Sequence, residues 1–370
     1  MRVAIVYDRI NKWGGAERVL LALHEMFPDA PLYTSLFDEK KAPWAKVFTK
    51  IHTSFLQNIP LAKSNHEFLG PLMPIAFEQF NFDNYEVVIS VTSESAKGII
   101  TKPETLHICY CLTPNRYLWS GYEEYFKSPF LRFLSLPIIR YLRYWDKIAA
   151  LRPDNVIAIS TEVKSRIEKY YHRQSEIIFP PMDSLGKIKK SEDSKDFYLL
   201  VGRMVPYKKM DLVVKTFNLL DKPLYIVGSG SEEWKLKLLA KRNIKFLGQV
   251  TDSKLSELYS KAKALILPQL EDYGIVSVEA QSYGVPVIAY KAGGSLDTVI
   301  DGETGIFFEK QNIESLTNAI EKFEKMSFNI KLPIANAKRF TKQVFKRRLQ
   351  EALIRTNNSR RRGNSSLATF

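Results

Sequence analysis

The chain has 370 residues, of which 45% are hydrophobic and 25% are charged, as in ordinary folded domains. Because a single core rarely grows beyond about 250–300 residues, this length predicts two domains. The formal net charge of +14 indicates an acidic partner, such as a phosphorylated ligand or an anionic lipid surface, and no nucleic-acid-binding motif is recognisable. The sequence has no run of 18 apolar residues that predicts a membrane span, and its two cysteines, Cys109 and Cys111, are too few for a zinc site.

The first half of the chain alternates short apolar runs with helical segments. Strands are predicted at 2–7, 86–91 and 106–111, and the first of these takes the place where a secretory signal would have its apolar core. We therefore expect a cytoplasmic protein. Gly14 and Gly15 precede a helix that begins near residue 16. Paired glycines let a ligand approach the backbone closely, and a plain turn explains them equally well.

The loop after the third apolar run carries Arg116 and Trp119. Loops at the carboxyl ends of parallel strands form the ligand crevice of such sheets. Arg116 and Trp119 are therefore candidate phosphate or acceptor contacts. A packed aromatic loop is at least as good an explanation for Trp119.

The stretch 130–147 mixes aromatic, leucine and basic side chains, with Arg140, Arg143 and Lys147 at helical spacing. Such a helix suits an anionic membrane surface. A helix of the domain with a basic, solvent-facing side is commoner, and we favour it on the sequence alone.

A polar, charged segment, 184–196, is the predicted linker between the two domains. It separates an acceptor-binding domain at 1–183 from a second domain at 197–340. We expect a C-terminal helix at 341–356. The remaining residues, 357–370, are rich in Arg, Ser and Asn, and we expect them to be disordered.

Two basic residues follow the strand predicted at 197–201. Arg203 and Lys208 leave the strand end through a glycine and a proline loop. Together they are suited to clamp a diphosphate, Arg by a forked contact and Lys as a point charge. Gly228 and Gly230 form a turn after the next strand, either as a nucleotide contact or as a tight turn.

The residues 268–290 predict a strand–loop–helix–strand unit of a parallel sheet. An apolar run precedes the loop, Gly274 is its hinge, and the helix is predicted over 275–283 with Gly284 after it.

This unit carries a candidate anion site. The amides of Gly274, Ile275 and Val276 lie at the start of the helix, where N–H groups have no helical partner and the helix dipole favours negative charge. Glu271 precedes the helix and Glu279 lies within it. Phosphates on the amides and ribose hydroxyls on Glu279 would make a nucleotide site, whereas two solvated glutamates are the plain alternative.

These motifs resemble, in their order, those of the family-4 retaining glycosyltransferases. The second-half motifs are Gly202-Arg203…Lys208, Gly228-Ser229-Gly230, Phe246-Leu247-Gly248, Glu271…Glu279-Ala280, Gly284-Val285-Pro286-Val287-Ile288 and Gly293-Gly294…Asp301-Gly302-x-x-Gly305. In the first half, Gly14-Gly15-Ala16-Glu17-Arg18 resembles the family, and residues 109–119, 145–146 and 178–183 resemble the branch that contains O-antigen mannosyltransferases.

The resemblance implies a GT-B fold, two Rossmann-like α/β domains with doubly wound parallel sheets that face each other across a cleft. It implies that Glu279 binds the ribose, that Glu271 and the following amides hold the donor sugar and phosphates, and that Arg203 and Lys208 stabilise the departing diphosphate. The implied donor is a nucleotide-diphosphate sugar, GDP- or UDP-linked with mannose favoured. The implied acceptor is a glycan or polyprenyl-linked glycan of cell-surface polysaccharide synthesis. No separate cofactor and no metal are expected, since the sequence contains no Asp-x-Asp pair.

Leu112 departs from the family, because many relatives have a histidine before Thr-Pro at this point. Leucine neither hydrogen-bonds a sugar nor assists proton transfer. This departure keeps open a second hypothesis, a non-catalytic or weakly active protein that binds nucleotide sugars.

Overall fold

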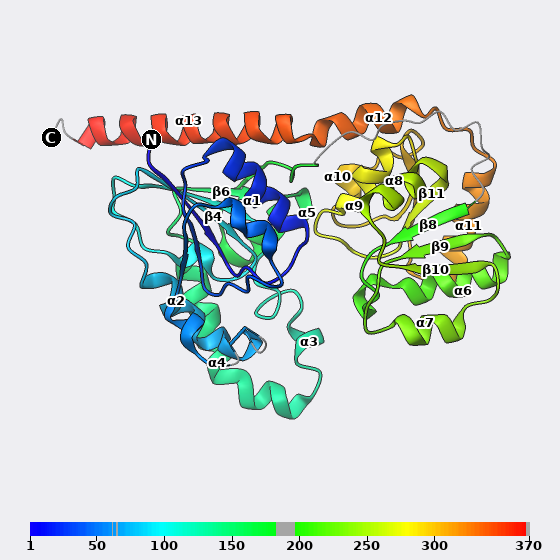
Figure 1. Ribbon diagram of the computed structural model, residues 1–370, viewed down its shortest axis with the longest axis horizontal. Helices are drawn as coiled ribbons and strands as arrows, with labels where there is room; N and C mark the ends of the chain where they lie inside the picture. The colour runs from blue at the N-terminus through cyan, green and yellow to red at the C-terminus, as the bar shows by residue number, and fades with distance from the viewer. Residues whose placement is uncertain (61, 64–65, 183–196, 368–370) are drawn as a thin grey trace. The chain divides into compact units, whose positions relative to one another are not determined.

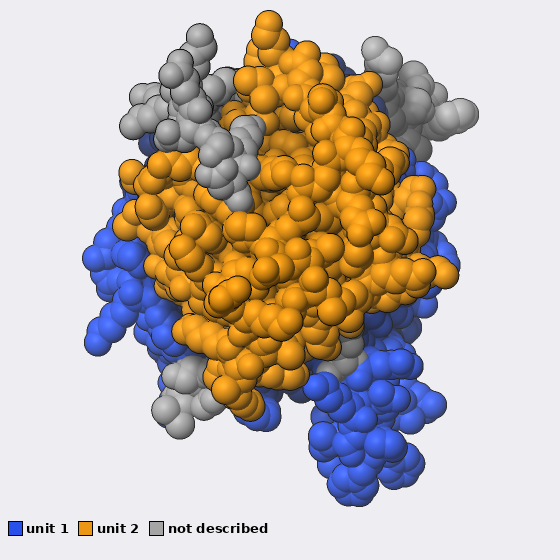
Figure 2. All heavy atoms as spheres, turned by 90° about the vertical axis from the view of Figure 1, so that its right-hand side faces the viewer, with its two compact units in different colours: residues 1–181, 343–370 blue, residues 182–342 orange. Residues whose placement is uncertain are grey.

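The computed structural model describes residues 1–60, 62–63, 66–182 and 197–367. The described chain divides into two compact units (Figure 2). Unit 1 comprises residues 1–181 and 343–370, and unit 2 comprises residues 182–342. The predicted linker, 184–196, lies outside the described residues.

Unit 1 is built on a seven-stranded parallel sheet in the order β3-β2-β1-β4-β5-β6-β7 (Figure 1). Its strands are β1 Val3–Tyr7, β2 Leu32–Thr34, β3 Ile51–Thr53, β4 Val87–Thr92, β5 Leu106–Cys111, β6 Asn155–Ala158 and β7 Glu176–Ile177. Its α-helices are α1 Gly15–Met26, α2 Met73–Glu78, α3 Tyr122–Tyr125, α4 Pro129–Ala149 and α5 Thr161–Tyr171, and its 3₁₀ turns are η1 Pro43–Val47, η2 Phe55–Asn58, η3 His66–Leu72 and η4 Ala96–Gly98. The strand order reverses between β1 and β4, so their carboxyl ends flank the position where such sheets bind ligands.

Unit 2 contains a six-stranded parallel sheet in the order β10-β9-β8-β11-β12-β13. Its strands are β8 Phe197–Val201, β9 Leu224–Val227, β10 Ile244–Gly248, β11 Ala262–Leu267, β12 Val287–Tyr290 and β13 Gly305–Phe308. Its helices are α6 Met210–Leu220, α7 Glu233–Leu239, α8 Asp252–Lys261, α9 Ile275–Ser282, α10 Ser295–Thr298, α11 Ile313–Glu324 and α12 Lys331–Ala337, with 3₁₀ turns η5 Pro206–Lys208 and η6 Lys338–Phe340. Here the strand order reverses between β8 and β11.

Both faces of the unit 2 sheet are buried, as expected of a parallel sheet covered by helices. Successive residues of one strand enter opposite cores: Tyr198 and Leu200 pack with α6 and α11, whereas Phe197 and Leu199 pack with α8 and α9. The two sheets confirm the predicted doubly wound α/β architecture.

The C-terminal segment differs from the expectation. The helix predicted at 341–356 is present as the first part of α13 Lys342–Leu367, which continues into 357–367, where we expected disorder. From residue 343 it belongs to unit 1. Phe345 packs edge-on against Tyr110 of β5 at 5.7 Å, and Leu349 and Leu353 are buried beside it. These anchors let the helix continue through a polar sequence that lacks an apolar face of its own.

Candidate functional site

The reversal of strand order in unit 2 brings two distant loops together. β8 and β11 are hydrogen-bonded neighbours, and the loops that follow them carry Lys208 and Glu271. Lys208 Nζ forms an ion pair with Glu271 Oε1, and Gln269 Nε2 donates to the same oxygen at 2.6 Å. Both members of the ion pair keep part of their surface open, 14% for Lys208 and 15% for Glu271. The pair therefore stands at the edge of the sheet where a phosphate would compete with Glu271 for the ammonium group.

Arg203, predicted to act beside Lys208, is on the same loop but has a different partner. Its Nη2 donates to the hydroxyl of Tyr207 at 3.0 Å, and its side chain is exposed. The structure thus brings Lys208 and Glu271 together and leaves Arg203 at the surface of the loop.

Helix α9 starts where the sequence predicted, immediately after Gly274. Gly274 has φ +82°, a left-handed conformation that glycine adopts without strain, and it makes no side-chain cap. The first-turn amides of Ile275 and Val276 have no partner within the helix, and they directly follow the loop that holds Glu271. Gly274 contacts that loop directly, since a Cβ there would lie 3.7 Å from Glu271 Cβ.

The far side of α9 is fixed by a buried network of amides. Gln281 Nε2 donates to the Thr298 carbonyl at 2.7 Å, and Asn336 Nδ2 donates to Gln281 Oε1 at 2.7 Å and to the Thr298 carbonyl at 2.8 Å. Satisfied buried networks of this kind make a local structure rigid. The carboxyl half of α9 is therefore fixed to α10 and α12.

Glu279 lies two-thirds along α9 and accepts a hydrogen bond from the hydroxyl of Tyr259, at 3.1 Å to Oε2. Tyr259 comes from α8, is buried, and stacks on Tyr283 with ring centroids 5.6 Å apart. Sequence reasoning missed Tyr259 and Gln269 as the residues that orient the two glutamates. The nearness of Gln269 to Glu271 in the sequence was the available signal.

Close packing between two loops requires glycine at positions 228 and 230. This agrees with the tight turn, which was the alternative to a nucleotide contact. A Cβ on Gly228 would lie 1.9 Å from the Gly202 carbonyl oxygen, and one on Gly230 would lie 2.4 Å from the Met204 carbonyl oxygen. Backbone hydrogen bonds join the same loops, from Met204 N to the Ser229 carbonyl at 2.9 Å. Glycine at these positions lets the loop that carries Arg203 and Lys208 pack closely against the loop after β9. A contact between these glycines and a nucleotide stays a prediction.

Gly293 and Gly294 support the Glu271 loop from the other side. The Gly294 amide donates to the Glu271 carbonyl at 2.8 Å, and a Cβ on Gly293 would lie 2.4 Å from that oxygen. Glycine at both positions lets the loop after β12 approach the loop after β11 closely.

In unit 1 the loops at the reversal of strand order, which follow β1 and β4, are joined by a buried carboxylate. Asp8 follows β1 and is buried, and its two oxygens accept from the backbone amides of Ser93, Glu94, Ser95 and Ala96 at 2.7–3.0 Å. The Thr92 hydroxyl donates to the same carboxylate at 2.9 Å. Arg9, the next residue, forms an ion pair with Glu94. The sequence signal for this cage is an acidic residue directly after a buried strand.

Gly14 and Gly15 lie at the start of α1, Gly14 as its N-cap and Gly15 as its first residue. A Cβ added to Gly15 would meet nothing within 4 Å. Glu17, in the first turn, is buried and accepts from the Tyr7 hydroxyl at 2.8 Å, and burial followed by the charge of Glu17 raises the pKa of Tyr7. The space at Gly15 agrees with a close backbone approach, which stays a prediction.

Trp119 lies in a packed aromatic cluster, in agreement with the alternative given for it. Its indole N–H donates to Asp146 Oδ2 at 2.7 Å, and its ring stacks on Tyr170 with centroids 5.1 Å apart. Asp146 is fully buried and pairs with the buried Lys97 at 2.5 Å. Arg116 contributes its backbone carbonyl to the turn, accepting from the Gly121 amide at 2.8 Å. Leu112 directly follows β5, and its amide donates to the Thr92 carbonyl at 2.8 Å.

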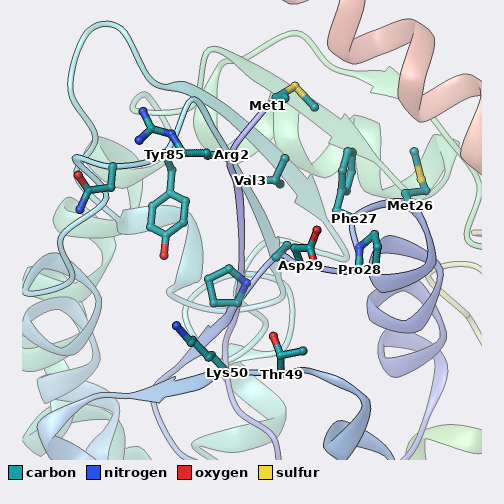
Figure 3. Close-up of a pocket in the computed structure, with 13 residues that line it drawn as sticks. Met1, Arg2, Val3, Met26, Phe27, Pro28, Asp29, Thr49, Lys50 and Tyr85 are labelled. Carbon is teal, nitrogen blue, oxygen red and sulfur yellow. The ribbon is translucent and has the colours of Figure 1, made fainter.

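A hollow of about 550 Å³ opens at the other edge of the unit 1 sheet (Figure 3). Its lining residues precede their strands, for example Arg2 before β1, Pro31 before β2, Lys50 before β3 and Tyr85 before β4. It therefore lies at the amino ends of the strands, away from the edge where doubly wound sheets bind ligands. Within the described ranges there is no cluster of three or more His, Cys, Asp or Glu side chains placed to hold a metal ion. Among the same residues no helix is both long and apolar enough to cross a membrane.

Comparison with known proteins connects this geometry to a family. Residues 183–346 match the family model described as glycosyl transferases group 1. The O-antigen chain mannosyltransferase RfbU of Salmonella typhimurium is 30% identical over 203 residues, which is 50% of this chain and 57% of that protein. A GDP-mannose-dependent monoacylated alpha-(1-6)-phosphatidylinositol monomannoside mannosyltransferase of Corynebacterium glutamicum is 34% identical over 135 residues, 32% of this chain and 35% of that protein. The chain spans about half the length of the curated relatives it matches, 52% and 57% for the first two.

Solved structures match nearly the whole chain. The crystal structure of Anabaena Alr3699/HepE in complex with UDP has a TM-score of 0.71 at 18% identity and covers 95% of this chain and 99% of that one. The apo form of the lipopolysaccharide outer core galactosyltransferase WaaB has a TM-score of 0.65 at 18% identity, with 96% and 99% covered. At these identities the likeness concerns the fold. The two parallel sheets and these solved structures show that the chain has the GT-B fold, and its residues 183–346 are similar to the group 1 glycosyl transferases.

Proposed function

We propose that this protein is a retaining, metal-independent hexosyltransferase that moves a sugar, with mannose favoured, from a nucleotide-diphosphate sugar to a glycan or lipid-linked glycan acceptor in cell-surface polysaccharide synthesis. The observation that carries the proposal is the Lys208–Glu271 pair at the strand-order reversal of unit 2, beside the amino end of α9. The mannosyltransferases among the relatives support mannose, and the UDP-bound neighbour supports a nucleotide-sugar donor.

Each part of a donor has a matching group in unit 2. The first-turn amides of α9 suit the diphosphate, because they combine free N–H donors with the positive end of the helix dipole. Glu279, oriented by Tyr259, suits the ribose hydroxyls, which are hydrogen-bond donors. Glu271, oriented by Gln269, suits the hydroxyls of the donor sugar.

The same residues account for the chemistry. As the bond between the anomeric carbon and the diphosphate oxygen breaks, negative charge grows on the diphosphate, and Lys208 and Arg203 stabilise it. In the proposed reaction the acceptor hydroxyl attacks from the side of the leaving group and gives its proton to the departing phosphate oxygen. The new glycosidic bond then keeps the anomeric configuration. These cations take the place of a divalent metal ion in the proposal.

We place the reaction in the cytoplasm, at the inner face of the membrane, because a lipid-linked acceptor has its glycan at a bilayer surface.

The test is a thermal-shift panel without metal, using GDP, UDP, ADP and their common sugar conjugates on wild type and Glu279→Ala. Glu303→Ala is the matched control, because Glu303 is an exposed glutamate of the same unit. We expect one base to stabilise wild type and the control, and to lose most of its effect in Glu279→Ala. The preferred conjugate then enters a transfer assay with a polyprenyl-linked acceptor. No stabilisation by any nucleotide would contradict donor binding.

A second candidate function rests on Leu112. It directly follows β5, at the carboxyl edge of the unit 1 sheet, and has no hydrogen-bonding atoms, whereas the family resemblance implies a histidine there. A protein that binds the donor without transferring the sugar would stabilise with nucleotide yet show no turnover. In that case we expect Leu112→His to raise turnover while leaving the thermal shift unchanged.

A further inference from the structure

Helix α4 exposes an apolar surface that the fold does not cover. In its first half, residues 129–138, no described residue is buried, although the sequence there is strongly apolar. These turns extend away from the sheet of unit 1 (Figure 1). We call the exposed apolar side chains the outer face of α4: Phe130, Leu131, Phe133, Leu134, Ile138 and Tyr141. Phe130 is 70% exposed and Phe133 is 77% exposed.

The outer face lies mainly on the turns that precede the part of α4 that packs on unit 1. The buried residues are confined to the second half of the helix: Ile139, Leu142, Trp145, Asp146 and Ala149. Their spacing of three and four residues defines one stripe. The outer face continues past the end of that stripe and therefore contributes little to the core of unit 1. Large contiguous apolar surfaces of this kind mark interaction sites.

The exposed charges on α4 are basic, and among the described residues they form no ion pair with a carboxylate. The helix carries Arg132, Arg140, Arg143 and Lys147, whereas its one acidic residue, Asp146, is buried against Lys97. Arg132 and Arg143 donate to the backbone carbonyls of Phe126 and Leu118, at 2.6 Å each, rather than to carboxylates. Their positive charge is thus not neutralised by these contacts.

We propose that the outer face of α4 docks unit 1 onto the surface of a bilayer that contains anionic lipids. Phe and Leu side chains beside Arg and Lys are the combination that inserts at the boundary between headgroups and acyl chains. A second copy of this chain is the poorer occupant, because each copy has a net charge of +14 and the basic residues would repel each other. Docking of this kind goes beyond the transfer reaction and depends on α4 alone.

The chain offers a matched control on α7. Trp234 and Leu238 are 68% and 79% exposed, one turn apart. The neighbouring Lys235 and Lys237 form ion pairs with Glu232 and Glu233, so this apolar surface has its charges neutralised. It differs from the outer face of α4 in charge and extent but not in the kind of side chain.

The experiment is flotation of the full chain with vesicles of phosphatidylcholine, with and without phosphatidylglycerol. We expect wild type to float with the anionic vesicles, less so as salt is raised, and weakly with the neutral ones. Phe130→Ser/Phe133→Ser should reduce flotation with anionic vesicles at least about tenfold, whereas Trp234→Ser/Leu238→Ser should not. Arg140→Glu should reduce it, and Lys310→Glu, an exposed lysine of unit 2, should have a smaller effect.

The outcomes separate this proposal from the proposed reaction. Nucleotide thermal shifts in all variants report that unit 2 is folded and binds its donor, whether or not the vesicles bind. Failure of wild type to float with anionic vesicles, or equal flotation of the Phe130→Ser/Phe133→Ser variant, would overturn the proposal. So would a lipid-free dimer of wild type that this variant abolishes, since the outer face would then belong to contacts between copies.

Discussion

The two units place charged residues at the same topological position and use them in opposite ways. In each sheet the loops at the reversal of strand order meet, after β1 and β4 in unit 1 and after β8 and β11 in unit 2. In unit 1 the loops are joined by Asp8, whose carboxylate oxygens accept hydrogen bonds from four backbone amides. In unit 2 they are joined by the side chains of Lys208 and Glu271, which stay partly open.

The difference lies in what a ligand would have to displace. The amides around Asp8 are buried or partly buried, and a buried N–H without an acceptor is costly, so this carboxylate is committed to the fold. Lys208 and Glu271 need only exchange one polar partner for another. One position of the fold thus holds a carboxylate committed to backbone amides in unit 1, whereas in unit 2 it holds an ion pair that stays partly open.

The largest expected effect comes from Asp8→Ala. It removes an acceptor from four amides, of which only that of Glu94 keeps another acceptor, the Thr92 hydroxyl. Because each buried unsatisfied donor costs roughly 1–3 kcal/mol, we expect a loss of about 3 kcal/mol or more in the free energy of unfolding. Urea unfolding measures this loss. Glu271→Ala is the control from the equivalent loop and should cost about 1 kcal/mol, since its ion pair is partly exposed. Equal losses in the two variants would break the comparison.

Lys208→Met should show the opposite pattern. We expect a fall of about 10²–10³-fold in kcat for sugar transfer, the usual effect of removing one preorganised group that stabilises transition-state charge. Stability should change by less than about 1 kcal/mol. Steady-state kinetics and urea unfolding of the same preparation measure both quantities. Full activity in this variant would exclude Lys208 from the chemistry.

Acid should weaken the two units over different pH ranges. Burial, followed by the charges of Arg173 and Arg152, lowers the pKa of His107 in unit 1 from 6.5 to about 3. In unit 2 burial acts to raise the pKa of Glu324, but hydrogen bonds from Lys263, Tyr198 and Lys222 outweigh it and hold the pKa at about 2.

The signs follow from proton binding by the unfolded chain. Unfolded His107 takes up a proton as pH falls below 6.5, whereas the folded residue stays neutral, so stability is lost from pH 6.5 down to about 3. The contribution of Glu324 is intact above pH 4.5 and is lost as pH falls from 4.5 toward 2. Urea midpoints of His107→Gln should therefore fall less steeply than those of wild type between pH 6.5 and 4.5, and those of Glu324→Gln should differ in slope only below 4.5. Unchanged slopes in both variants would contradict this assignment.

The smallest expected effect is that of Tyr259→Phe, which removes the hydroxyl that orients Glu279. A hydrogen bond of this kind contributes about 1 kcal/mol, so nucleotide affinity should fall about fivefold. Calorimetric titration measures the affinity. Tyr283→Phe removes a neighbouring hydroxyl that bonds Ser256 instead, and it should leave the affinity unchanged.

Local structure was largely predictable from the sequence, because buried parallel strands appear as apolar runs. Leu106–Cys111 was predicted to the residue, and α9 begins after Gly274 as expected. Contacts between loops were not predictable, because strand order is not written in any local pattern. The pairing of Lys208 with Glu271 joins residues 63 positions apart, and the cage of Asp8 joins residues 84 to 88 positions apart. The sequence also left open whether Gly228 and Gly230 pack or bind a nucleotide, since the residues that they contact lie on another loop.

Helix α13 has a consequence for biosynthesis. Residues 182–342 form unit 2 as one continuous stretch, whereas unit 1 needs both the first 181 residues and the helix that follows unit 2. On the ribosome, which releases the amino end first, unit 1 begins to fold while Phe345 and Leu349 have not yet been made. The Tyr110 side of its sheet then stays uncovered until the whole of unit 2 has emerged. The domain encoded first is therefore completed last, and a chain halted before α13 would present an apolar sheet surface to chaperones and proteases.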